Sequence, residues 1–474
     1  MAEENTLPPI SPIVVTFGFE LEFAVKSLPD QFLDPEPDDP RRVHGITRSE
    51  NHPKDQFLPY LGSPDAIEEN EVLWKETTNN FTTQLDALQI DMAKLLTENG
   101  LPAVAQLDEE QPENPSIEDL KYWVISNDTT INHGLSHNPN EPTYFWWPIE
   151  IQSPAYFYSE ENKLKVRNVL QCIDSVYRTN CDLSADIHVH IGNGQKGFDA
   201  RIIRKFMAFV YTFENQIATI HPPHYMTQRA FSKPVRTHSL LAQVARDYRA
   251  ETEKSGAEES LREFDEDFII DTILERDTVD ELVKLLSSPE LEEDRLFKRL
   301  TYSICNLGTD AEKVKKTIEF RQHKSTFDDE EVYHWITVCA SLVNFASTVD
   351  EEVLRKFCKE RFHKTVDEFS IVEVLMALGR PAQAYYYGIR VFSGKEERAE
   401  EERKLHKEIA DENRKKEQER EHRRNLEERR RQEEADLQME EKRLEREEKK
   451  RRQDEEEEKR LEDLLKKIGK GELQ

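Results

Sequence analysis

The sequence predicts an α+β protein: an antiparallel sheet surrounded by helices, followed by a long charged helix at the C-terminus. Three observations lead to this prediction. Segments in which apolar and polar residues alternate, the pattern of a half-buried antiparallel strand, recur through the body of the chain. Segments with apolar residues at helical spacing lie between these strands. The last part of the chain is low in complexity and consists mostly of Glu, Lys and Arg.

The first half of the chain alternates between predicted strands and helices. After a flexible lead at 1–12, residues 13–25 alternate and are rich in β-branched and aromatic side chains, which indicates a strand. A loop dense in Pro and Asp follows at 28–64, and a helix is predicted at 71–99, where Gly100 is a stop signal. Further elements are expected in this order: strands 121–126 and 144–152, helix 162–179, strand 184–191 and helix 199–220.

The second half of the body is predicted to be mostly helical. Residues 240–300 are charged and helical in pattern, and we interpret them as a cap or insertion. A last clear strand is expected at 315–323, followed by helices 329–345, 351–362 and 367–378. These elements together predict one domain that extends from residue 13 to residue 392.

The segment 393–474 is predicted to be a charged, low-complexity helix or coiled coil. Its apolar residues are too sparse to sustain heptads, but Glu–Lys and Glu–Arg pairs four residues apart each stabilise a helix by about 0.2–0.5 kcal/mol. A disordered polyampholyte is the alternative. If helical, the segment would offer a surface for a protein partner or for self-association.

Negative charge is concentrated in the body of the protein. The chain has a net charge of −30, and the 28 acidic and 25 basic residues between Lys395 and Ile468 account for only −3 of it. The body would therefore repel nucleic acid phosphates and anionic membrane surfaces, and would attract divalent cations or basic partners. We accordingly expect no nucleic acid partner and no membrane partner.

Cysteine usage and the N-terminal residues favour a cytoplasmic protein. The five cysteines include no Cys-x-x-Cys pair or other zinc-binding spacing, so we interpret them as reduced thiols. The first residues lack the basic and apolar regions of a signal peptide, and no apolar run approaches the roughly 18 residues of a membrane span.

Four predicted strands carry acidic or histidine side chains on one face. The two-residue period of a strand places Glu20 and Glu22 on the same face of the first strand, beside Gly18. The same period groups the following side chains on three other strands: Glu150; Asp186, His188 and His190; and Glu319, Arg321 and His323.

A solvated sheet face is the simpler interpretation of any one of these strands, because antiparallel sheets commonly present polar residues to water. Four such strands together favour a site, since a solvated face would carry Lys, Thr, Ser and Gln. Carboxylates this close would raise one another's pKa unless cations neutralise them. Mg²⁺ binds carboxylate oxygens and leaves positions for phosphates, and Arg321 would supply a bidentate contact to a phosphate oxygen. This combination predicts phosphoryl transfer.

Five short motifs follow one another along the chain. They are FGFELEF around Glu20 and Glu22, WVISND ending at Asp128, IEIQSP around Glu150, IHVHIG around His188 and His190, and TIEFRQH around Glu319 and Arg321. In this order and strand context they resemble the amidoligase family, from about residue 13 to about residue 345. That family is related to glutamate-cysteine ligases and glutamine synthetases, within the carboxylate-amine ligase superfamily.

The resemblance implies a curved antiparallel sheet of the glutamine synthetase type as the catalytic domain. It implies ATP and Mg²⁺ as cofactors, with Mn²⁺ as an alternative ion, bound in a funnel between the nucleotide and the acceptor carboxylate. Glu319 and Arg321 are expected to act in catalysis, with Arg321 stabilising the transferred phosphate, and Asp128 is expected on the substrate side. The implied metal ligands are Glu20, Glu22, Glu150, His188, His190 and Glu319.

The implied reaction joins a small-molecule or peptide carboxylate to an amine. The γ-phosphate of ATP would activate the carboxylate as an acyl phosphate, which the amine then attacks to give an amide. This route needs no covalent enzyme nucleophile, in agreement with the lack of a Ser-His-Asp or Cys-His signature. The loop 221–229 lies where relatives carry a basic substrate loop, so Arg229 is expected to contact the cofactor.

Residues 192–197, Gly-Asn-Gly-Gln-Lys-Gly, match the Gly-x-Gly-x-x-Gly dinucleotide fingerprint. The strand before them is half polar, unlike a buried parallel strand, and no acidic residue ends a second strand ~20 residues later. We therefore interpret this segment as a turn. Its backbone amides, beginning with Gly192, would then be candidates for contact with a nucleotide phosphate.

Two other functions are compatible with parts of the pattern. A cupin-like enzyme would use the His-x-His pair and one Glu for a single transition metal, but it leaves Glu20, Glu22 and Arg321 without a role. A catalytically degenerate ligase fold would instead act as a scaffold that positions partners, with the charged tail as a spacer.

Overall fold

The computed structural model describes most of the body of the chain. The described residues are 12–29, 34, 36–46, 81–107, 121–132, 134–135, 144–221, 232–255, 261–289, 299–309, 315–392, 451, 452, 456, 459 and 460. The chain divides into two units, 1–397 and 398–474, and each is considered by itself. Arg229, residues 1–11, most of the 28–64 loop and nearly all of the charged tail lie outside the described residues. The five described tail residues are helical and exposed.

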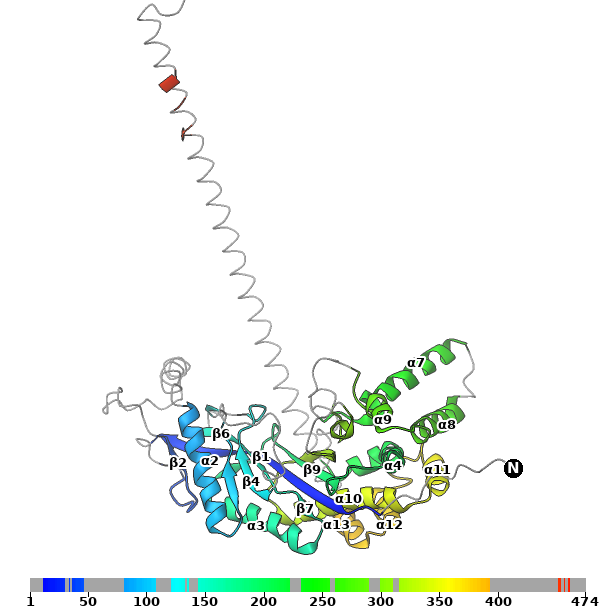
Figure 1. Ribbon diagram of the computed structural model, residues 1–474, viewed down its shortest axis with the longest axis horizontal. Coiled ribbons are helices and arrows are strands. Elements are labelled where there is room, and N and C mark those ends of the chain that lie inside the picture. Colours follow the sequence, from blue (N-terminus) through cyan, green and yellow to red (C-terminus); the bar gives the residue numbers. More distant parts are fainter. Residues whose placement is uncertain are drawn as a thin grey trace, which may run out of the picture. The chain divides into compact units, whose positions relative to one another are not determined.

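One mostly antiparallel sheet organises the body, as the alternating strands predict. Its strands follow the order β10-β11-β9-β1-β6-β4-β3, of which Figure 1 labels β9, β1, β6 and β4. Among the described strands, β1 pairs with β2 and β3 pairs with β4 in parallel, and the other strand pairs are antiparallel. The strands of this order are β1 (Val15–Pro29), β3 (Ala103–Ala105), β4 (Trp123–Ser126), β6 (Phe145–Gln152), β9 (Asp186–Asn193), β10 (Tyr302–Ser303) and β11 (Thr317–Lys324). Four short strands pair with β1 or β6: β2 (His44–Ile46), β5 (Gly134–Leu135), β7 (Tyr156–Phe157) and β8 (Thr179–Asn180).

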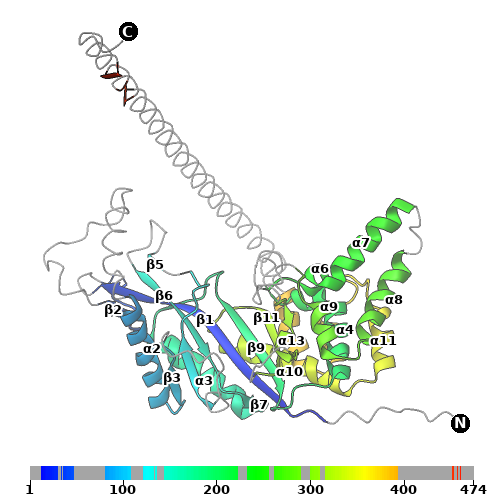
Figure 2. The same ribbon diagram turned by 45° about the horizontal axis from the view of Figure 1, so that its top comes forward.

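The long strand β1 forms the centre of the sheet. It pairs along one edge with β9 and along the other with β6, and Figure 2 shows these three strands side by side. Its alternation has the predicted sense, because Phe19, Leu21 and Phe23 are completely buried in the main hydrophobic core. The opposite face of β1 therefore carries Glu20 and Glu22.

Helices cover the apolar face of the sheet. Helix α10 (Asp329–Thr348) contacts β1 and β9, and α2 (Phe81–Glu98) contacts β3 and β4. Helix α3 (Glu160–Val176) contacts both of these helices. Local signals set the helix ends: the Ser159 side chain accepts the backbone N–H of Asn162, and Gly100 has a φ of 77° after α2.

A second group of helices surrounds α4 (Ala200–Ala218), which packs on α10. The predicted helical region 240–300 contains three of them among its described residues. This group consists of α6 (Val235–His238), α7 (Leu240–Ser255), α8 (Leu261–Leu274), α9 (Val279–Leu286), the 3₁₀ turn η5 (Cys305–Leu307), α11 (Glu351–Lys359), α12 (Ile371–Ala377) and α13 (Pro381–Phe392).

The fold bears on two predictions, one about the cysteines and one about membrane spans. All five cysteines are free thiols. Within the described residues, no single helix is long and apolar enough to span a membrane. Helices α10 and α11 meet these two criteria only when taken together, and they are bent by 120° relative to each other.

A buried carboxylate in α4 makes the stability of this helical group depend on pH. Glu214 is 1% exposed and accepts the backbone N–H groups of Val235 and Arg236 at 2.8 Å each. Burial raises the pKa of Glu214 to about 7, although these two hydrogen bonds act in the opposite direction. The folded state therefore favours the protonated form of this acid.

Protonated Glu214 therefore favours the folded state. We predict that this stabilisation is fully present below pH 4.5, the usual pKa of Glu, and is lost as the pH rises to about 7. The unfolding free energy of the wild type should fall by about 3 kcal/mol relative to that of Glu214→Gln across this range. Urea denaturation of both proteins at several pH values measures it. A difference that does not change with pH would contradict the prediction.

Candidate metal centre

The face of the sheet opposite the helices brings the predicted acidic and histidine residues together. Antiparallel pairing sets Glu20 opposite His188, Glu22 opposite Glu150, and His190 opposite Glu319. Cross-strand partners lie on the same face with Cβ atoms roughly 4.5–5.5 Å apart. Residues from β1, β6, β9 and β11 therefore share one surface, as the two-residue period predicts.

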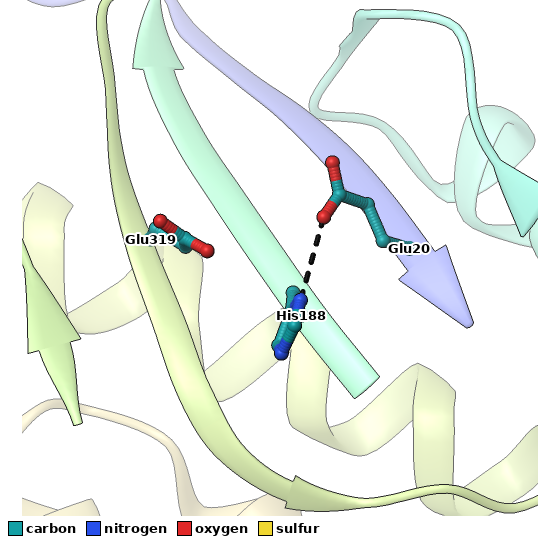
Figure 3. A group of neighbouring side chains, drawn as sticks. All are labelled: Glu20, His188 and Glu319. Atoms are coloured by element: carbon teal, nitrogen blue, oxygen red, sulfur yellow. Dashed lines mark ion pairs between the residues drawn. The ribbon is translucent and has the colours of Figure 1, made fainter. Parts of the chain in front are cut away.

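Three of these side chains form a potential metal-binding group. The ligand atoms of Glu20, His188 and Glu319, from three adjacent strands, lie within 4.8 Å of one another (Figure 3). Nδ1 of His188 lies 3.4 Å from Oε2 of Glu20. Oε2 of Glu319 and Nε2 of His188 are buried without a hydrogen-bond partner in the described part of the chain. Buried polar atoms normally have partners, so these two fit a divalent cation that accepts carboxylate and imidazole ligands.

His190 and Glu22 lie at the edge of this group. Nε2 of His190 is 3.2 Å from Oε1 of Glu20, and Nδ1 is hydrogen bonded to the Thr317 hydroxyl at 2.9 Å. Oε1 of Glu22 lies 3.8 Å from Nε2 of His188, while its other oxygen accepts the backbone N–H of Asp186 at 2.8 Å. Partners on the second nitrogen of a histidine fix its orientation. Both residues can therefore complete or support the ligand set.

Three cationic side chains approach the carboxylates. Arg321 is hydrogen bonded to Oε1 of Glu319, and a guanidinium nitrogen of Arg299 lies 3.8 Å from the same oxygen. Nζ of Lys315 lies 3.1 Å from Oε1 of Glu20. Arg321 was predicted, whereas Lys315 and Arg299 were not. The alternation that places Glu319 and Arg321 on the site face extends back to Lys315 and could have indicated it, but Arg299 carries no such local signal.

These cations control the protonation of two carboxylates. Burial would raise the pKa of Glu20, but His190 and Lys315 hold it well below its ordinary value. Burial opposes ionisation of Glu319 too, yet Arg321 and His190 lower its pKa to about 2. Both groups are therefore ionised at neutral pH, as metal ligands must be.

Glu150 has the opposite electrostatic environment at the β6 side of the site. Burial and the neighbouring charges of Glu20 and Glu22 raise its pKa well above the ordinary value, and Asp128 adds to this effect. Its Oε2 accepts a hydrogen bond from the Ser126 hydroxyl at 3.3 Å. Glu150 is thus a carboxylate that a further cation or ammonium group would help to ionise.

Asp128 lies on the loop that follows β4 and is held in a turn. Its side chain accepts the N–H of Thr130 at 2.7 Å, and its carbonyl accepts the N–H of Ile131. Ile131 is buried against Ala24, on the site-facing side of β1. The loop therefore forms a wall next to Glu150, and a substrate-side role for Asp128 stays a prediction.

The expected position of His323 was wrong. Strict alternation predicted that His323 projects with Glu319 and Arg321, but β11 contains a bulge between Phe320 and His323. The extra residue reverses the alternation, so His323 pairs with the core residue Ile187 and packs 5.4 Å from the Trp335 ring. A bulge shifts every later side chain of a strand to the other face.

The Gly-x-Gly-x-x-Gly segment forms a turn between β9 and α4, as interpreted. Gly194 and Gly197 have φ values of 55° and 69°, which glycine adopts without strain. Gly192 lies within the sheet, where a Cβ atom would come 2.7 Å from Oγ1 of Thr16. This close approach accounts for the glycine at position 192, and contact with a nucleotide stays a prediction.

The fold and this site define a sheet-based protein in which clustered carboxylates and a histidine could hold a divalent cation. The family described as "Putative amidoligase enzyme" matches residues 14–343. The match spans well over half of the chain and includes all the strands that carry the site, and the chain therefore belongs to this family. Membership indicates an enzyme with a ligase function. A search of curated proteins gives no match.

We predict that Glu20→Gln weakens Mn²⁺ binding by more than about tenfold, since even the outer partners of metal ligands contribute ~10–100-fold to affinity. Isothermal titration calorimetry measures this on the full chain. Glu161→Gln is the matched control, because the Glu161 side chain is 83% exposed on α3. Equal affinities of Glu20→Gln and the wild type for Mn²⁺ would contradict the assignment.

Proposed function

We propose that the protein is an ATP-dependent carboxylate-amine ligase that forms an amide through an acyl phosphate. The observation that carries the proposal is the convergence of Glu20, His188 and Glu319 on one sheet face, with Arg321 directly beside them. Family membership supports the ligase class. The choice of ATP and of the acyl phosphate rests on the resemblance to the amidoligase family, and the carboxylates and Arg321 are compatible with phosphoryl transfer.

The residues divide into a group for cations and a group for phosphate. Glu20, His188 and Glu319 would hold Mg²⁺ or Mn²⁺, with Glu22, His190 and Glu150 as further ligands. A bound divalent ion would neutralise phosphate oxygens during transfer. Arg321, 7% exposed, keeps a preorganised guanidinium next to the position where that charge develops.

The proposed reaction has two chemical steps, and neither forms a covalent bond to the enzyme. A carboxylate oxygen of the acceptor attacks the γ-phosphorus of ATP, and ADP leaves. The incoming ammonium group loses one proton, the resulting amine nitrogen attacks the acyl carbon, inorganic phosphate leaves, and the nitrogen loses a second proton to solvent. The side chains around the site would orient the two substrates and shield the acyl phosphate from water.

The β6 side of the site suits the amine. Glu150, Glu22 and Asp128 create a negative potential there, whereas Arg321 and Arg299 lie beside Glu319 on β11, and Lys315 lies between Glu20 and Gln152. An incoming ammonium group would be attracted to the first side and a phosphate to the second. This separation favours a reaction between a phosphate-activated acid and an amine.

We expect ADP release from ATP and Mg²⁺ when a pool of amino acids, amines and peptide acids is supplied. Arg321→Lys keeps the charge but loses the bidentate guanidinium, so kcat should fall about 10²-fold or more. Arg361→Lys, a change on the distant α11–α12 connection, is the matched control and should retain the wild-type rate.

A wild-type protein that binds Mg²⁺ but releases no ADP with any pool would contradict the ligase proposal and support a scaffold. Iron, manganese or zinc retained at one equivalent through purification, without ATP turnover, would favour a cupin-like enzyme instead. Equal rates for Arg321→Lys and the wild type would remove Arg321 from the mechanism.

A further inference from the structure

Lys315 reaches the site from the residues directly before β11. Its Nζ donates hydrogen bonds to Oε1 of Glu20 at 3.1 Å and to Oε1 of Gln152 at 3.3 Å. Gln152 is the cross-strand neighbour of Glu20 on β6. The Lys315 side chain is 31% exposed, so its stem enters from the rim while the ammonium group lies against a candidate metal ligand.

Glu20 is the member of the candidate metal group whose two oxygens both have partners. Oε1 faces Lys315 and His190, and Oε2 faces Nδ1 of His188. By contrast, Oε2 of Glu319 has no hydrogen-bond partner in the described part of the chain. An ion that binds Glu20 would therefore share a carboxylate oxygen with one of these partners or replace it. The ammonium of Lys315 is the partner with a permanent positive charge, and it would repel a divalent ion most strongly.

The charges of the site also affect how Lys315 and a divalent ion compete for Glu20. Four carboxylates, those of Glu20, Glu22, Glu150 and Glu319, face three cationic side chains within the described residues, those of Lys315, Arg299 and Arg321. Asp128 adds a further negative charge on the Glu150 side, so Lys315 compensates only part of the negative charge of the carboxylates. A divalent ion between Glu20, His188 and Glu319 would add positive charge near Arg321 and Arg299, which favours an anion as the next ligand there.

We propose that Lys315 is a resident counter-cation of Glu20 that a divalent metal ion displaces, and that its ammonium group then binds the phosphate of the nucleotide. The proposal deepens the proposed function and rests on it for the identity of the metal and the nucleotide. Lysine suits this exchange, because its ammonium group is a point charge on a flexible four-carbon stem.

Calorimetry of Mn²⁺ binding to the full chain without nucleotide tests the first half. Lys315→Met removes the competing charge and keeps the apolar stem, so Mn²⁺ should bind about tenfold more tightly or better. Lys316→Met is the matched control, since Lys316 is exposed and adjacent in sequence. Mn²⁺ affinity that is unchanged or weaker in Lys315→Met would overturn the proposal, as would an equal gain in Lys316→Met.

Binding of a nonhydrolysable ATP analogue to the Mn²⁺-loaded protein tests the second half. Lys315→Met should bind the analogue about tenfold more weakly than the wild type, whereas Lys315→Arg should retain most of the affinity. An unchanged analogue affinity in Lys315→Met would overturn the transfer of the ammonium group to phosphate. Circular dichroism verifies folding, and Lys315→Gln replaces the Met variant if that variant unfolds.

These outcomes are independent of the ligase assay. Tighter Mn²⁺ binding by Lys315→Met together with no ADP release from the wild type would support the counter-cation and overturn the ligase. ADP release from the wild type with unchanged Mn²⁺ affinity in Lys315→Met would support the ligase and overturn the counter-cation.

Discussion

The central constraint in this protein is the clustering of carboxylates on one face of a sheet whose other face is the hydrophobic core. Strand β1 pairs on both edges, so Glu20 lies opposite His188 on β9 and Gln152 on β6. Glu22 lies opposite Glu150 on β6. Bringing such charges together in a partly buried place is unfavourable unless cations compensate them. The cationic side chains of the site provide that compensation.

Compensation is uneven across the sheet. Glu319 and Glu20 have Arg321, Arg299 and Lys315 within ion-pair distance, and the pKa values of both carboxyl groups are lowered. Glu150 lies on β6, which β9 and β1 separate from β11, and its pKa is raised by burial and by its mainly acidic neighbours. One side of the site is therefore prepared for anions and the other for cations. An enzyme that joins an activated acid to an amine needs such a separation of charge.

The core fixes the geometry of strand β11, which carries Glu319 and Arg321. Phe320 packs edge-on against Phe206 and Trp335, at 5.7 Å and 6.1 Å between ring centroids. After the bulge, His323 lies against Trp335 and its Nε2 is 3.5 Å from Glu331 of α10. Side chains on both sides of Arg321 are thus anchored in the core. This anchoring limits the motion of the guanidinium group and keeps it beside Glu319.

The sequence by itself determined which residues share a face, since the two-residue period of a strand is a local property of the backbone. Glu20, Glu22, His188, His190 and Glu319 could be predicted in this way, together with the antiparallel strands that carry them. Only the tertiary structure decided the register between strands, the bulge that turns His323 into the core, and the approach of Lys315 and Arg299. These features depend on contacts between residues far apart in the chain, which no local pattern encodes. The same long-range packing decided that Glu150 is buried among acidic neighbours while Arg321 and Arg299 lie beside Glu319, and so how charge is distributed over the site.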